Sequence, residues 1–209
     1  MRAKLFYIMI AAAVVAVPAA AQKAASAKYA AHLTPLNEKA SGHKSSAEAT
    51  FTVRGDSLTI DIRARGVAPD LAHLQHFHGF PDGHASACPT SAQDKNSDGV
   101  IDLMETEATA GTTMVPFTAD PVSMEIVVNT YPKSSANGEY HYRKTVSLSA
   151  LEAAFGTKYA GQKLDLDKRV VFIHGVPAST KLPSTVASLG DIPAQVTIPI
   201  ACGKIELVK

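Results

Sequence analysis

The stretch ATFTVRGDSLTIDIRARG, residues 49–66, decides the class of fold. Apolar residues alternate with polar ones on both sides of its RGD, with Phe51 and Val53 before it and Leu58, Ile60 and Ile62 after it. A period of two places successive side chains on opposite faces of a strand, whereas a helix needs a period near 3.6. The stretch therefore predicts a β-hairpin with one buried face and one solvated face.

Further short elements are predicted outward from this hairpin. Strands are expected at 73–80, 122–129, 139–149, 168–174 and 194–202, separated by loops rich in Gly, Pro, Ser and Asn. One helix is expected at 149–156, with Ser149 as its N-cap and Gly156 as its stop. Many short strands with one short helix predict an all-β protein, built as an antiparallel sandwich or barrel.

The N-terminus predicts export. The 209-residue chain begins MRAKLFYIMIAAAVVAVPAAAQ, with a basic start, an apolar run and small residues before Gln22. This pattern is typical of a cleaved signal peptide, and the run is too short to span a bilayer. We therefore expect a signal peptide at 1–21, a flexible leader at 22–29 and one secreted or periplasmic domain at 30–209, without membrane association after cleavage.

Net charge limits the classes of binding partner, and the cysteine content predicts a disulfide. Cleavage would remove Arg2 and Lys4 but no acidic residue, which leaves 18 basic against 19 acidic residues. Such a balanced charge does not predict binding to nucleic acid. The two cysteines, Cys88 and Cys202, lie in the mature part, and an isolated pair in an oxidising compartment is expected to form a disulfide.

Histidines predict a metal site. Four of the eight lie within HLQHFHGFPDGH, residues 73–84. On a strand, His76 and His78 point to one face and His73 to the other. His174 ends a separate apolar strand, RVVFIHG. Neutral imidazole suits copper and zinc best, so these side chains predict a site for such an ion.

These features together resemble the Cu,Zn superoxide dismutases. The shared order is H-x-H on a strand, a cysteine ten residues later, a strand ending V-x-x-H, and a last strand with ACGKI. The resemblance implies a Greek-key antiparallel β-sandwich of that type, with superoxide as substrate. It also implies copper ligation by His76, His78 and His174, and a disulfide between Cys88 and Cys202.

The chain departs from that family in two places. The stretch after Cys88, where the family carries its zinc histidines, has none, so no zinc site of that type is expected. Pro199 stands where the family has an arginine that attracts superoxide. Two functions therefore stay open: copper-dependent dismutation, or a non-catalytic copper-holding or calcium-binding module on the same sandwich. His84 is either a fourth copper ligand or an exposed loop residue.

The segment DKNSDGVIDLME, residues 94–105, matches the spacing of an EF-hand calcium loop. Gly99 occupies the sharp turn, and calcium prefers six to eight oxygen ligands. The expected ligands are Asp94, Asn96, Asp98, the carbonyl of Val100, Asp102 and Glu105. Because no entering helix is predicted, we expect an isolated loop in which calcium stabilises the structure and does not act as a signal.

Overall fold

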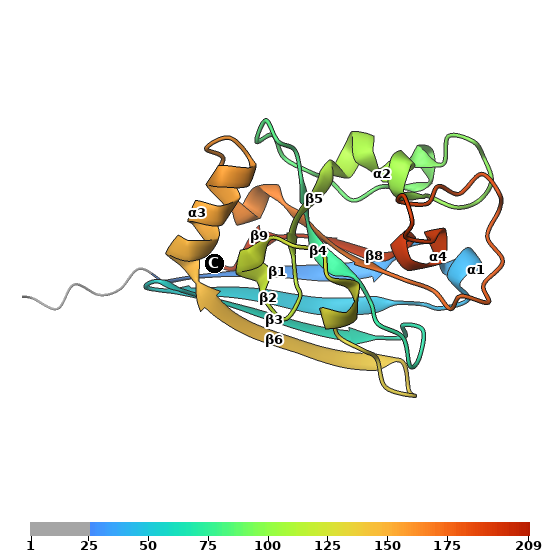
Figure 1. Ribbon diagram of the computed structural model, residues 1–209, viewed down its shortest axis with the longest axis horizontal. Coiled ribbons are helices and arrows are strands. Elements are labelled where there is room, and N and C mark those ends of the chain that lie inside the picture. The colour runs from blue at the N-terminus through green and yellow to red at the C-terminus, as the bar shows by residue number, and fades with distance from the viewer. Residues whose placement is uncertain (1–25) are drawn as a thin grey trace, which may run out of the picture.

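The computed structural model describes residues 26–209, so the predicted signal peptide and residues 22–25 lie outside the described residues. One sheet has the strand order β5-β4-β7-β8-β1-β2-β3-β6, with β9 paired to β1, and all of these pairs are antiparallel. The sheet curls into a half-barrel, with β6 along its lower edge in Figure 1. The predicted all-β class is confirmed at this level.

The strands differ widely in length, and the longest lie in the half of the sheet that contains the hairpin. They are β1 (Ser26–Pro35), β2 (Ser46–Arg54), β3 (Ser57–Arg65), β4 (Gln75–Gly79), β5 (Thr112–Pro116), β6 (Glu139–Ser147), β7 (Val170–His174), β8 (Pro199–Lys204) and β9 (Glu206–Leu207).

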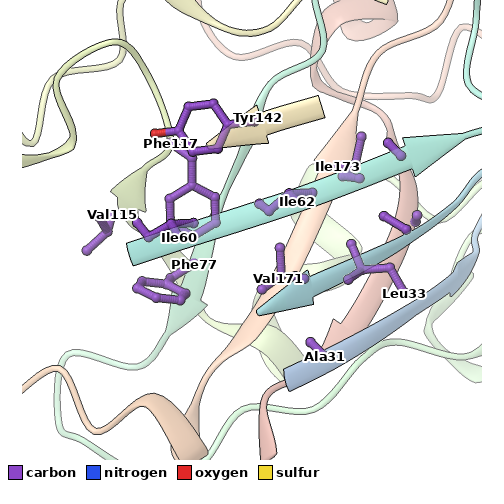
Figure 2. Close-up of a cluster of buried hydrophobic side chains, with 14 of the residues drawn as sticks. Ala31, Leu33, Ile60, Ile62, Phe77, Val115, Phe117, Tyr142, Val171 and Ile173 are labelled. Carbon is purple, nitrogen blue, oxygen red and sulfur yellow. The ribbon is translucent and has the colours of Figure 1, made fainter. Parts of the chain in front are cut away.

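The predicted hairpin is confirmed as β2 and β3. Phe51 pairs with Ile60 and Arg54 with Ser57, and Gly55 takes a φ of 57° at the turn between the strands. The apolar residues of its alternating pattern face inward. Figure 2 shows side chains of β1, β3, β4, β5, β6 and β7 meeting one another between the two halves of the sheet, which forms the main core.

More helix is present than the one short helix that the sequence predicted. The helical segments are α1 (Glu38–Ser41), α2 (Leu103–Ala110), α3 (Leu148–Lys158) and α4 (Ala194–Thr197), with 3-10 turns η1 (Ser91–Gln93), η2 (Pro121–Ser123), η3 (Val128–Thr130) and η4 (Leu166–Lys168). Within residues 26–209, none of the helices has the length and apolar character needed to cross a bilayer.

The predicted helix exists as α3, but both of its predicted ends are wrong. Ser147 is the N-cap, because its Oγ accepts a hydrogen bond from the Ala150 amide at 3.2 Å. The helix passes through Gly156 and ends at Lys158. Burial of Phe155 holds this last turn in place and overrides the low helix propensity of glycine.

Other predicted segments also differ from the structure. Residues 122–129 form no strand, because Pro121 starts a 3-10 turn and Met124 takes a left-handed φ of 59°. The segment 194–202 begins as α4 before β8. Residues 26–29, the last part of the predicted leader, form the start of β1, where Tyr29 pairs with Phe51 and Leu207.

A disulfide links the chain between β4 and β5 to the face of the sheet that points away from the main core. The predicted disulfide is confirmed, and it joins Cys88 of this excursion to Cys202 of β8. Ala110 at the end of α2 packs beside it, in a small second cluster with Val170 and Phe172. This excursion includes η1 and α2, and it covers the face of β4 that points away from the main core.

Candidate metal centre

The fold brings the three predicted histidines together. His76 and His78 lie on β4, and His174 ends β7, which pairs with β4. Phe77, between the two histidines of β4, faces the main core. Because side chains alternate along a strand, His76 and His78 project to the opposite face, as the sequence predicted.

The three imidazoles form a compact and buried cluster. His76, His78 and His174 are each at most 4% exposed, and each offers one ring nitrogen within 4.8 Å of the others. Nitrogens bound to one ion through bonds of about 2.0 Å lie at most about 4 Å apart, so a small side-chain rotation completes the site. Within residues 26–209, this is the single group of three or more His, Cys, Asp or Glu side chains arranged in this way.

Hydrogen bonds determine which nitrogens can bind a metal. Nδ1 of His78 donates to the Gly111 carbonyl at 3.0 Å, and Nδ1 of His174 donates to the Thr197 carbonyl at 2.6 Å. Each neutral ring then keeps a lone pair on Nε2. Nε2 of His76 lies 3.0 Å from Nε2 of His78 and donates to it, which leaves the lone pair of His76 on Nδ1.

Two of these lone pairs lack any protein partner. His76 Nδ1 and His174 Nε2 are buried and accept no hydrogen bond. A buried polar atom without a partner costs about 1–3 kcal/mol, so an unpaired nitrogen in a core needs an explanation. A metal ion bound by these nitrogens provides one, and the donor set fits it.

The cluster is electrically neutral at ordinary pH. Burial and, to a smaller extent, the neighbouring His174 lower the pKa of His78 to about 3. Burial also lowers the pKa of His174 to about 4, and it lowers that of His76 together with the charges of the other two rings. Neutral imidazole is the form that binds metal, so the site is ready for an ion without first losing a proton.

Two side chains that support the cluster were not identified from the sequence. His73 places Nδ1 2.9 Å from the His174 carbonyl and Nε2 2.9 Å from the Ala68 carbonyl, and so fixes the end of β7. Thr113 on β5 places its Oγ1 3.2 Å from His76 Nε2. The sequence placed His73 on the strand face opposite to His76 and His78, so it was not predicted to support them. Thr113 was missed because no sequence pattern predicted β5.

Gly111 connects helix α2 to this site. Its φ is 75°, and a Cβ atom at this position would lie 2.2 Å from the carbonyl oxygen of Gly79. Only glycine allows this close approach, which brings the Gly111 carbonyl within reach of His78. The end of α2 therefore sets the orientation of one metal-binding ring.

Two hollows give access to the histidines. An outer hollow of about 270 Å³ has His78 in its wall, and an inner one of about 20 Å³ touches His76 and His174. They share four lining residues, Leu103, Thr113, Ile126 and Leu189. A hollow of about 10–15 Å³ holds about one water, so the inner hollow takes one water-sized molecule.

Charge is scarce around these hollows. Of the residues that line either one, all of them in the described part of the chain, Glu107 alone carries a charge. Pro199, at the position where an arginine would have served an anionic substrate, pairs with His174 on β8. The approach to the histidines therefore favours cations over anions.

His84 lies apart from the cluster of His76, His78 and His174. Its Nδ1 is 2.5 Å from Asp82 Oδ1, its ring stacks on Phe80 with centroids 3.6 Å apart, and 56% of its side chain is exposed. The three ring nitrogens that converge belong to His76, His78 and His174. Of the two interpretations left open by the sequence, the structure matches the exposed loop residue.

The acidic loop is a compact turn organised by its own carboxylates. Asp94 accepts hydrogen bonds from the amides of Asp98 and Gly99, and Asp98 accepts one from Val100. Glu105 accepts from the amides at positions 95, 96 and 102. In the described chain, no three carboxylates of this loop approach one another as closely as the three imidazoles do.

Hydrogen bonds connect the acidic loop to two distant segments of the domain, one at Asn37 and one at Ala187. The Asn37 side chain donates to the Ile101 carbonyl at 2.8 Å and accepts from the Ile101 amide at 2.8 Å. Asp102 caps α2 and also accepts from the Ala187 amide at 2.7 Å. In place of an entering helix, the single 3-10 turn η1 precedes the loop, whereas the exit helix α2 has eight residues.

Comparison with known proteins yields no family. No protein-family model matches this chain, and no curated protein matches its sequence. The three-histidine geometry therefore carries the functional argument.

Proposed function

We propose that this protein is an exported copper-binding protein that holds one copper ion through His76, His78 and His174. The observation that carries this proposal is the convergence of three buried, neutral imidazoles, two of which have an unpartnered lone pair. Holding the metal, with no catalytic step, is the role that the surroundings favour best.

The chemistry of the site favours copper, in its cuprous state. Imidazole suits copper well, and neutral ligands in a buried site bring no negative charge to balance a divalent ion. Because the cost of burying an ion rises with the square of its charge, a monovalent ion costs about a quarter as much to desolvate as a divalent one. The inner hollow leaves room for one further small ligand at most.

The test is metal analysis followed by a competition titration with cuprous ion. Replacing His76, His78 or His174 with Ala should weaken copper affinity at least about tenfold, because three-coordinate binding loses one bond. Two exposed histidines provide the matched controls: His32, which pairs with Glu48, and His141, which pairs with Asp61. If His174→Ala binds copper as tightly as the parent, the proposed site is wrong.

Superoxide dismutation is the second candidate function. The water-sized hollow beside His76 and His174 supports it, because a small oxygen species would fit there. A bound copper would supply the one-electron chemistry, and the protein would supply access and the three ligands. Glu107 opposes it, since its carboxylate repels an anion. A superoxide assay of the copper-loaded protein, with His174→Ala as the blank, decides between the two roles.

We also propose that the half-barrel is a Greek-key sandwich of the superoxide dismutase-like type. Support comes from the strand order, in which β8 returns beside β1 and so completes the order 8-1-2-3. The disulfide from the excursion after β4 to the Ala-Cys-Gly of β8 adds to it. An experimental structure with copper bound would test this assignment.

The acidic loop is our proposed calcium site, with a structural role. Support comes from the sequence spacing, from the positive φ of 84° at Gly99, and from Asp102 as the N-cap of α2. A bound ion stabilises the native state by about 2.7 kcal/mol at a hundredfold excess over Kd.

Calcium should therefore raise the melting temperature of this protein, and Glu105→Gln should remove most of that rise, because Glu105 would supply two oxygens. Glu125→Gln, outside the loop and exposed, is the control. If millimolar calcium leaves the melting temperature of the wild-type protein unchanged, the proposed calcium site is wrong.

A further inference from the structure

The outer hollow contains two side chains that can bind a metal and that the three-histidine site does not use. Met104 and Glu107 both line it, one helical turn apart on α2, together with His78. Residues three apart on a helix lie on the same face, so their side chains can reach the same ion. We infer that Met104 and Glu107 form an entry position, where a cuprous ion binds before it is transferred to His78; this inference rests on the proposed copper site.

The exposure of Met104 is the first argument. Its side chain is 59% exposed, the highest value among the large apolar residues of the described chain. A methionine in this setting gains little from the hydrophobic effect, but its thioether is a soft ligand that selects cuprous ion. The other two methionines of the described chain, Met114 and Met124, are buried and line neither hollow.

The charge of Glu107 is the second argument. As the one charged side chain on either hollow, it gives the mouth a negative potential. A carboxylate beside a thioether attracts a monovalent cation without binding it too tightly to release. The apolar residues around them, Leu103, Ile126 and Leu189, lower the local dielectric and so strengthen this attraction.

The geometry of His78 completes the path. Its ring is the one metal-binding imidazole that lines the outer hollow, and its Nδ1 proton stays on the Gly111 carbonyl. The transfer is a ligand exchange: the bond from copper to the Met104 sulfur breaks as a bond to His78 Nε2 forms. The hydrogen bond that His76 Nε2 donates to this nitrogen is released in the same step. Copper remains cuprous throughout, and no electron is transferred.

Loading kinetics provide the test, with cuprous ion supplied as its acetonitrile complex, which is a cation. Met104→Leu should slow loading at least tenfold while equilibrium affinity changes less than threefold, because the final ligands are unchanged. Glu107→Gln should slow loading and flatten its dependence on salt. Met124→Leu is the matched control, since it removes a thioether that lines neither hollow.

The outcomes separate this inference from the proposed copper site. If the wild-type protein binds no cuprous ion, the proposed function fails. If it binds copper through the histidines and Met104→Leu loads at the wild-type rate, only the entry position fails. In a second measurement on the His78→Ala variant, silver ion should shift the methyl resonance of Met104 and leave that of Met124 in place; an unmoved Met104 signal would also overturn the inference.

Discussion

Acidification should destabilise the metal-free protein through its buried imidazoles. His78 and His174 have folded-state pKa values of about 3 and about 4, against 6.5 in an unfolded chain. Below pH 6.5 these histidines bind protons in the unfolded chain but stay neutral in the folded protein. The free energy of unfolding therefore decreases as the pH is lowered. Their stabilising contribution is therefore complete above pH 6.5 and is lost progressively toward pH 4.

The expected size follows from these two values. At about pH 4.5, two units below the unfolded pKa, each ring contributes a loss of about 2–3 kcal/mol, since one pKa unit is about 1.4 kcal/mol. The pair should therefore lower the free energy of unfolding by about 5 kcal/mol relative to pH 7.5. Burial also lowers the pKa values of His73 and His76, so these two rings act in the same direction. A domain stable by about 5–15 kcal/mol would lose a third or more of its stability.

Urea unfolding of chelator-treated protein, followed by circular dichroism between pH 7.5 and 4.5, measures this loss. The range stops at pH 4.5 because the carboxyls with lowered pKa values, Asp56, Asp61 and Asp98, contribute below it. His78→Gln should reduce the slope by about 1.4 kcal/mol per pH unit, whereas the exposed His32→Gln should leave it unchanged. A total loss below about 1.5 kcal/mol would refute the reasoning, because it would mean that the rings are protonated in the folded state.

Three further predictions concern the supports of the site. Replacing both Cys88 and Cys202 with Ser should lower the free energy of unfolding by about 5 kcal/mol in urea titrations, because the bond closes a loop of more than a hundred residues; a loss below about 1 kcal/mol would contradict this. Gly111→Ala should weaken copper affinity about 10–100-fold by displacing the carbonyl that orients His78, as measured by competition titration, and wild-type affinity would refute that role. His84→Ala should leave copper affinity unchanged in the same titration, and a tenfold loss would make His84 a ligand after all.

The elements with a strong local pattern were predictable. The hairpin of β2 and β3 follows from strict alternation, and the helix at α3 from its composition. Elements that depend on distant partners were not predictable. β5 is a five-residue edge strand stabilised by pairing with β4, and the run at 126–128 has the composition of a strand but lies exposed, because no partner strand reaches it.

The histidines of the candidate site were predictable, but their surroundings were not. Imidazoles at i and i+2 on a strand must share a face, which made His76 and His78 a pair from sequence alone. His174 was added because it ends a separate apolar strand, and resemblance to a family gave it the role of a third copper ligand. The residues around the cluster, Gly111, Thr113 and Met104, carry no sequence signal because they come from other elements.

The sequence by itself determined the alternation that makes a sheet, the chemistry of the available ligands, and the presence of two cysteines that can pair. Those properties are local, since they depend on side-chain type and on spacing of a few residues. Only the tertiary structure decided that three imidazoles would be buried, neutral and partly unpartnered, and that a methionine and a glutamate would stand at their entrance. Burial, pKa and access depend on which distant segments pack together, and pairing of β4 with β7 under α2 arises only when the chain folds.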